Sequence, residues 1–168
     1  MPINFIEAKC QETTSVELFG LCDDPPPSQD PAYINYDTAS KPGWIAEVHN
    51  KIPMEVTFTA IDNCIDVKRT DGTDESRSEG YLTYSDTIIF VELKNRISKG
   101  WLAKGRDQLI MTISLYNENH GLAAFVHKRA HVANAQRPFF ESNFQSVIEE
   151  MKTRNGFILD VQTKIEII

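Results

Sequence analysis

Residues 79–94 read EGYLTYSDTIIFVELK, and this stretch decides the predicted fold. Two runs of β-branched and aromatic residues flank the polar pair Ser85-Asp86, which is typical of a β-hairpin with a two-residue loop. Such a loop pairs the residues on its two sides symmetrically, so Glu79 lies opposite Glu92. Because side chains alternate along a strand, Lys94 points to the same face as Glu92.

Two carboxylates and one ammonium are therefore expected at one end of an otherwise apolar hairpin. Burial disfavours a charged carboxylate, and close like charges repel unless a cation lies between them. In the alternative interpretation, Glu92 and Lys94 form a weak, solvated ion pair at an exposed sheet end. Asp86 lies roughly 20 Å from Glu92 along the strand, which assigns it to the turn.

An acidic residue before a hairpin, followed by Glu-x-Lys at the end of its second strand, resembles the core motif of the PD-(D/E)XK nuclease superfamily. This family has the restriction-endonuclease-like fold. The resemblance implies that Glu79 and Glu92 hold Mg²⁺ or Mn²⁺, helped by the backbone carbonyl of Leu93, and that Lys94 is the catalytic lysine. The sequence departs from the family at position 79, where the family usually has Asp.

The resemblance extends over residues 44–130. It implies a helix with a carboxylate before the sheet, for which Trp44–Asn50 offers Glu47 as a further candidate metal ligand. It also implies a helix with a polar residue after the Glu-x-Lys strand. Residues 101–116 fit the second helix, because Leu102, Leu109, Ile113 and Tyr116 form one apolar stripe. Gln108 lies on a neighbouring stripe and is a candidate to orient a water or the scissile phosphate. The expected fold class is α/β, with a mixed central β-sheet flanked by helices.

Further candidates surround this motif. Asp62 and Asp66, on a strand predicted within residues 55–69, compete with Glu79 for the role of first acid, with Asp66 as the second choice. The strand predicted at Leu122–Val126 runs parallel to the Glu92 strand and places a basic cluster at its carboxyl end. The possible phosphate contacts are Arg77, Arg96, Lys104, Lys128 and Arg129.

The chain is expected to form one domain with three parts: residues 1–43 are an N-terminal extension with a proline-rich loop, residues 44–130 a nuclease-like core, and residues 131–168 a C-terminal helix and strand. The last helix is predicted from Pro138, with an apolar face of Phe140, Phe144, Val147, Ile148 and Met151. Gly156 ends it, and a closing strand follows over residues 157–168.

The composition bounds the setting. No apolar run of about 18 residues predicts a membrane span, and the expected location is cytoplasmic. Three cysteines without metal-ligand spacing indicate neither a disulfide framework nor a zinc site. The net charge is −7, yet residues 1–93 hold 6 Lys and Arg against 17 Asp and Glu, whereas residues 94–168 hold 11 against 7. A local basic groove for nucleic acid is therefore compatible with an acidic whole.

Two functions follow as expectations. The first is a Mg²⁺-dependent phosphodiesterase that acts on DNA, either as a monomer or as a homodimer. The second is the same fold without turnover, acting as a binding module for a protein partner, for example a toxin-neutralising protein or an accessory subunit. Metal binding discriminates between them, because a silent relative need not retain a metal site.

Overall fold

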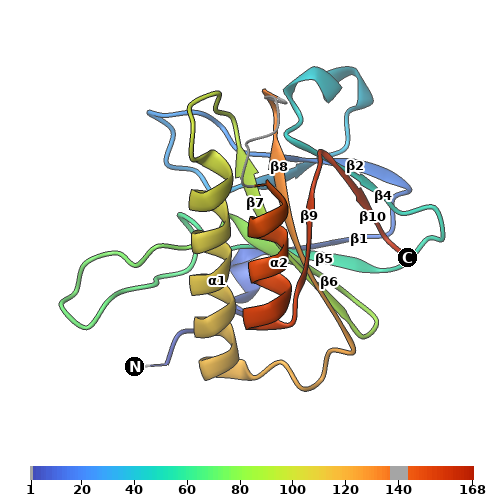
Figure 1. Cartoon of the computed structure of the whole chain (residues 1–168). Helices are drawn as coiled ribbons and strands as arrows, with labels where there is room; N and C mark the ends of the chain where they lie inside the picture. The colour runs from blue at the N-terminus through green and yellow to red at the C-terminus, as the bar shows by residue number, and fades with distance from the viewer. Residues whose placement is uncertain (1, 137–143) are drawn as a thin grey trace.

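The described part of the chain, residues 2–136 and 144–168 of a computed structural model, forms two β-sheets and two α-helices (Figure 1). The larger sheet has the strand order β1-β5-β6-β7-β8-β9 and the smaller sheet β10-β4-β2-β3. Both sheets mix parallel and antiparallel pairs. The elements are β1 (Gln11–Thr14), β2 (Leu18–Cys22), β3 (Tyr33–Asn35), β4 (Ala46–His49), β5 (Val56–Ala60), β6 (Gly80–Tyr84), β7 (Thr87–Lys94), α1 (Trp101–His120), β8 (His127–Asn134), α2 (Phe144–Asn155), β9 (Ile158–Val161) and β10 (Lys164–Glu166), with short 3₁₀ helices at Ala8–Cys10 and Thr38–Gly43.

The predicted hairpin is confirmed in its residues and in its register. Tyr84 pairs with Thr87 and Gly80 with Val91, so the pairing is symmetric about Ser85-Asp86. Ser85 has a φ of 47°, as the first residue of a tight hairpin turn requires. The register brings Glu79, directly before β6, to the level of Glu92 on β7.

β7 lies inside the six-stranded sheet, and every one of its residues is buried. Its two faces belong to different cores. Ile88 and Phe90 pack in the core beneath the helices, whereas Ile89, Val91 and Leu93 pack in the core shared with the four-stranded sheet. The molecule therefore has three layers, with both helices on one face of the larger sheet and the smaller sheet on the other (Figure 1). By alternation, Glu92 and Lys94 face the helix side.

The α/β class and the mixed central sheet are confirmed, and so is the helix that follows the Glu-x-Lys strand. α1 is longer than predicted, and its apolar stripe of Leu102, Leu109, Ile113 and Tyr116 is buried. α2 carries Val147 and Met151 into the same core and ends before Gly156, which has a φ of +69°. Pro138 and Phe140 lie outside the described residues, as does the side chain of Phe144.

The short helix predicted over Trp44–Asn50 is wrong, because Ala46–His49 is the strand β4 of the smaller sheet. The burial of β4 alternates, as a half-buried strand requires, and so short a segment fits a helical or a strand period equally well. Trp44 packs across β2, where a Cβ at Gly20 would lie 2.1 Å from Trp44 Cδ2. Only a glycine fits this close approach.

Three other strand predictions need correction. β5 ends at Ala60, where a turn replaces the rest of the strand expected up to Arg69. The strand predicted at Leu122–Val126 is a loop, and the parallel partner of β7 is β8, which starts at His127. The closing segment forms β9 in the larger sheet and β10 in the smaller one rather than a single strand.

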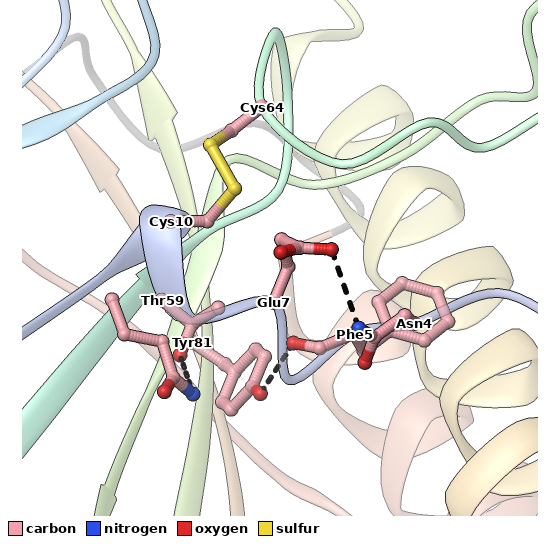
Figure 2. Close-up of a disulfide and its surroundings, with 8 residues drawn as sticks. Asn4, Phe5, Glu7, Cys10, Thr59, Cys64 and Tyr81 are labelled. Atoms are coloured by element: carbon pink, nitrogen blue, oxygen red, sulfur yellow. Dashed lines mark hydrogen bonds between the residues drawn. A yellow bond between two sulfur atoms is a disulfide. The ribbon is translucent and has the colours of Figure 1, made fainter.

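A disulfide joins Cys10 to Cys64, so the expectation of no disulfide is wrong (Figure 2). The bond ties the 3₁₀ turn before β1 to the turn after β5. Cys22 is free and buried. In the same region Phe5 is buried, and its carbonyl accepts a hydrogen bond of 2.8 Å from the Tyr81 hydroxyl (Figure 2).

Within the described residues, no helix has the length and apolar character needed to cross a membrane.

Candidate functional site

The end of β7 holds a buried ion pair. The Lys94 ammonium lies 2.8 Å from Glu92 Oε1, and the two residues are only 6% and 1% exposed. β7 places both side chains on the helix side, two residues apart, in a strand whose residues from Ile88 to Val91 are all apolar. The alternative of a solvated pair at an exposed sheet end is therefore wrong.

Helix α1 covers this pair. A Cβ at Gly105 would lie 3.5 Å from Glu92 Cγ, Lys94 Cε and Val132 Cγ1, so the helix backbone approaches both site side chains closely. One turn further along, Gln108 Oε1 accepts a hydrogen bond of 2.5 Å from Lys94 Nζ. The predicted meeting of Gln108 with the Glu-x-Lys motif is confirmed.

The two carboxylate oxygens of Glu92 have different surroundings. Oε1 binds Lys94, whereas Oε2 is buried and has no hydrogen-bond partner among the described residues. Burial raises the pKa of Glu92, and the Lys94 ammonium and the nearby backbone amide of Glu79 oppose this rise. A buried carboxylate oxygen without a partner is costly, and a bound ion or an ordered water is among the usual reasons for such an atom in native structures.

Glu79 adds a second carboxyl at the same level. Its backbone carbonyl accepts a hydrogen bond of 2.8 Å from the Ile61 amide. Burial raises the pKa of Glu79 well above its usual 4.5, and the nearby carboxylates of Glu92, Asp23 and Asp62 raise it further, whereas Lys94 lowers it. The field at this end of the hairpin is therefore negative, and a cation would relieve it.

The oxygen donors that the family motif implies here are two carboxylates and a backbone carbonyl. Within the described residues, no three side chains of His, Cys, Asp or Glu form a group that could hold a metal ion by themselves. Glu79, Glu92 and the carbonyl of Leu93 are hard oxygen donors, which suit Mg²⁺ or Mn²⁺ ions that keep several bound waters. Glu92 Oε2 is the atom whose environment fits such an ion best.

Glu47 does not join them. It lies on β4 in the smaller sheet, and its Oε1 pairs with Lys41 at 3.2 Å and with His49 at 2.8 Å. Burial alone would raise the pKa of Glu47, but the contacts with Lys41 and His49 lower it. The predicted ligand role of Glu47 depended on the helix that is absent, and its carboxylate serves a local ion pair instead.

The acids after β5 differ in position. Asp66 is 80% exposed and pairs with Lys68, so it lies outside the site. Asp62 binds Arg77 Nε at 2.8 Å and contributes to the negative field on Glu79. Asp23, directly after β2, contributes in the same way and was missed by the sequence analysis, because nothing in residues 1–40 indicated chemistry.

The predicted phosphate contacts divide into three groups. The guanidinium of Arg77 is occupied by acids, pairing with Asp62 and, at 3.9 Å, with Asp74. Arg96 and Lys104 are exposed, in the loop after β7 and beside Gly105. These two remain compatible with a phosphate near the site.

Lys128 and Arg129 are in the wrong place for that role. They begin β8 and pair with Ile88 and Ile89, at the end of the sheet opposite Glu92. Arg129 donates a hydrogen bond of 2.8 Å to the carbonyl of Glu166. The prediction placed this basic cluster at the carboxyl end of a strand, and the shift of β8 along the sequence reverses its position.

One residue gained importance only in the structure. Thr112 is fully buried on α1, and its Oγ1 accepts a hydrogen bond of 2.7 Å from the Ser78 amide, next to Glu79. Its four-residue spacing from Gln108 on one helix face was the only sequence signal.

Comparisons of the chain with protein-family models, curated proteins and solved structures find no match. The function must therefore be argued from the site itself.

Proposed function

We propose that this protein is a metal-dependent phosphodiesterase that cleaves DNA. The observation that carries the proposal is the buried Oε2 of Glu92, beside Lys94 and level with Glu79, which has no hydrogen-bond partner among the described residues. The resemblance to the PD-(D/E)XK nucleases supports it, because the hairpin, the Glu-x-Lys strand end and the helix with a polar residue occur together in the same order. The restriction-endonuclease-like core is part of the same proposal.

Glu79, Glu92 and the carbonyl of Leu93 would hold Mg²⁺ or Mn²⁺. The metal, when bound, lowers the pKa of a water molecule and offsets charge on the phosphate. Without metal, burial raises the pKa values of both carboxyls, and the carboxylates of Glu92, Asp23 and Asp62 raise that of Glu79 further. Metal uptake is therefore expected to release protons.

Lys94 would stabilise the phosphate charge that develops in the transition state. Its ammonium has three N–H donors, of which one points to Glu92 Oε1 and one to Gln108 Oε1. These two acceptors fix the buried ammonium and would leave the third donor for a substrate oxygen. Gln108 acts on the substrate through Lys94 rather than by direct contact.

DNA would approach over the exposed start of α1. Arg96 and Lys104 lie there, whereas Asp23 and Asp62 lie on the Glu79 side. Phosphates are attracted to the first side and repelled by the second. The overall acidic charge therefore does not prevent local binding.

The test is cleavage of plasmid and single-stranded DNA with Mg²⁺ or Mn²⁺, together with metal titration by calorimetry. Glu92→Gln and Lys94→Met should abolish cutting, and Glu92→Gln should also weaken metal uptake. A matched control exists on β10, where Lys164 and Glu166 form a half-exposed pair with the same two-residue spacing. Lys164→Met and Glu166→Gln should cut like the wild type.

A second candidate function is a binding module with the same fold but no turnover. The Glu92–Lys94 pair favours it, because the two charges already neutralise each other without an ion. The calorimetry separates the two: a wild-type protein that takes up no divalent metal and cuts neither DNA is the binding module. Cutting that survives both site substitutions would contradict the proposed residues.

A further inference from the structure

We propose that Thr112 and Arg77 are positioning residues of this site, which hold Glu79 and Lys94 in register through the segment Arg77–Glu79. This inference rests on the proposed function and goes beyond it, because neither residue would touch the metal or the substrate.

The first observation is a pair of bonds between α1 and this segment. Gln108 Nε2 donates to the carbonyl of Arg77 at 3.1 Å, and the Ser78 amide donates to Thr112 Oγ1 at 2.7 Å. Gln108 and Thr112 are four residues apart and so lie on one helix face. Helix α1 therefore binds both polar groups of the Arg77–Ser78 peptide unit, one residue before Glu79.

The Thr112 hydroxyl makes two hydrogen bonds, one as acceptor and one as donor. It accepts from the Ser78 amide and donates to the carbonyl of Gln108 at 2.9 Å, and both Thr112 and Ser78 are fully buried. Loss of the hydroxyl would leave the Ser78 amide without a partner in the core. The segment would then shift, and the Glu79 carboxyl would shift with it.

The second observation is that the turn after β5 also bonds the segment Arg77–Glu79, on the side away from α1. The turn after β5 bonds the segment twice, through the Ile61 amide to the carbonyl of Glu79 at 2.8 Å and through Asp62 to Arg77 Nε, also at 2.8 Å. Arg77 Nη1 donates to the carbonyl of Glu75 at 3.1 Å. The Arg77 guanidinium thus fixes the peptide whose carbonyl faces Gln108.

The carbonyl of Arg77 sets the orientation of the Gln108 amide. Because Nε2 donates to this carbonyl, Oε1 faces the Lys94 ammonium. The opposite orientation would place an NH₂ group against an ammonium and a carbonyl oxygen against a carbonyl oxygen. Arg77 therefore positions Lys94 through Gln108, whereas Thr112 positions Glu79 through Ser78.

The two halves predict different kinetic defects. Thr112→Val should raise the Mg²⁺ concentration for half-maximal cleavage about tenfold, the loss expected for one buried hydrogen bond, and saturating metal should restore most of kcat. Thr112→Ser keeps the hydroxyl and should behave like the wild type. Thr87→Val is the matched control, since Thr87 is also buried but lies at the opposite end of β7.

Arg77→Gln should lower kcat about tenfold at saturating DNA and metal, with the KM for DNA unchanged, and Arg77→Lys should recover part of the loss. A phosphate contact, the role indicated by sequence alone, would instead raise KM. A raised KM with unchanged kcat, or a Thr112→Val protein with a wild-type metal requirement, would overturn the proposal.

Hydrogen exchange of the Ser78 amide separates this proposal from the proposed function. Thr112→Val should accelerate this exchange and Thr112→Ser should not, in metal-free protein and without any activity assay. A wild type that neither binds metal nor cuts DNA refutes the proposed function alone. An unchanged Ser78 exchange in Thr112→Val refutes the positioning role, whatever the activity.

Discussion

Removal of the Cys10–Cys64 disulfide should destabilise the protein by about 4 kcal/mol. The bond closes a loop with a sequence separation of 54 residues. In the chain-entropy account, a cross-link of this span removes about 14 cal/mol/K from the unfolded chain, or about 4 kcal/mol at 25 °C. Domains of this size have total stabilities of about 5–15 kcal/mol, so the loss is a large fraction.

The assay is urea unfolding of the wild type and of the double variant Cys10→Ala/Cys64→Ala, each with and without a dithiol reductant. The reductant should lower the wild type to the level of the double variant and leave the variant unchanged. Cys22→Ala is the control, because Cys22 is a buried thiol outside the cross-link. Its stability should fall by less and should not respond to the reductant.

The double variant should still fold at 25 °C. The N-terminal segment keeps its other contacts, since Phe5 is buried and bonds Tyr81 and His120. A loss below about 1 kcal/mol, or a wild type insensitive to the reductant, would refute the entropic reasoning. Disulfides persist mainly in oxidising compartments, so in a reducing cytoplasm, the predicted location, this contribution would be absent.

Three further predictions concern pH and the cover of the site. The pKa of Glu79 is raised in the folded state, so the folded protein binds more protons than the unfolded chain, and this carboxyl lowers the stability as pH rises above about 4.5. Glu79→Gln should therefore raise the Tm of the metal-free protein at pH 8–9, as thermal scans can check. The same variant should weaken metal uptake in calorimetry. Burial lowers the pKa of His131 to about 4, so the free energy of unfolding should fall by up to about 3 kcal/mol as pH drops from about 6.5 to 4. In urea unfolding at a series of pH values, His131→Gln should show a much smaller fall over this range. An alanine Cβ at position 105 fits at ordinary contact distance, so Gly105→Ala should stabilise the protein by up to about 1 kcal/mol and retain metal uptake. The larger side chain of Gly105→Leu should displace Lys94 and abolish metal uptake in calorimetric titration. A steep acid loss in His131→Gln, or metal uptake in Gly105→Leu, would contradict these two.

The sequence predicted the hairpin well because its determinants are local. A two-residue loop fixes the register of both strands, and the alternation of β7 then places Glu92 and Lys94 on one face. Helix α1 could be predicted equally well, since its 20 residues provide several turns of helical periodicity. The position of Gln108 near the Glu-x-Lys motif could be predicted from that helix and from its connection to β7.

The errors arose where structure depends on distant residues. β4 is four residues long and becomes a strand because β2 and β10 pair with it, a fact absent from its own periodicity. The disulfide joins residues 54 apart in sequence, and the spacing of three cysteines does not reveal which pair meets. Glu47 was assigned through the first of these errors.

The placement of Lys128 and Arg129 shows how a small shift can invert a functional prediction. Apolar residues at 122–126 suggested a strand, yet they form a loop, and the sheet continues through residues 127–134. A basic run expected at the carboxyl end of a strand thus stands at its start. In a parallel pair, the start of β8 lies beside the start of β7, far from Glu92.

The buried Glu92–Lys94 pair is hard to explain by stability. Desolvation of two charges costs as much as their attraction returns, and apolar residues of similar size in such a place are often at least as stabilising. β7 is apolar at every position from Ile88 to Val91, so the chain could have continued with such residues. Instead it places two charges there, adds Glu79 at the same level and leaves Glu92 Oε2 without a hydrogen-bond partner among the described residues. The burial of these charges weakens the metal-free fold, and the proposed metal-dependent function would account for it, because a bound cation would offset the repulsion on Glu79 and give Glu92 Oε2 a partner.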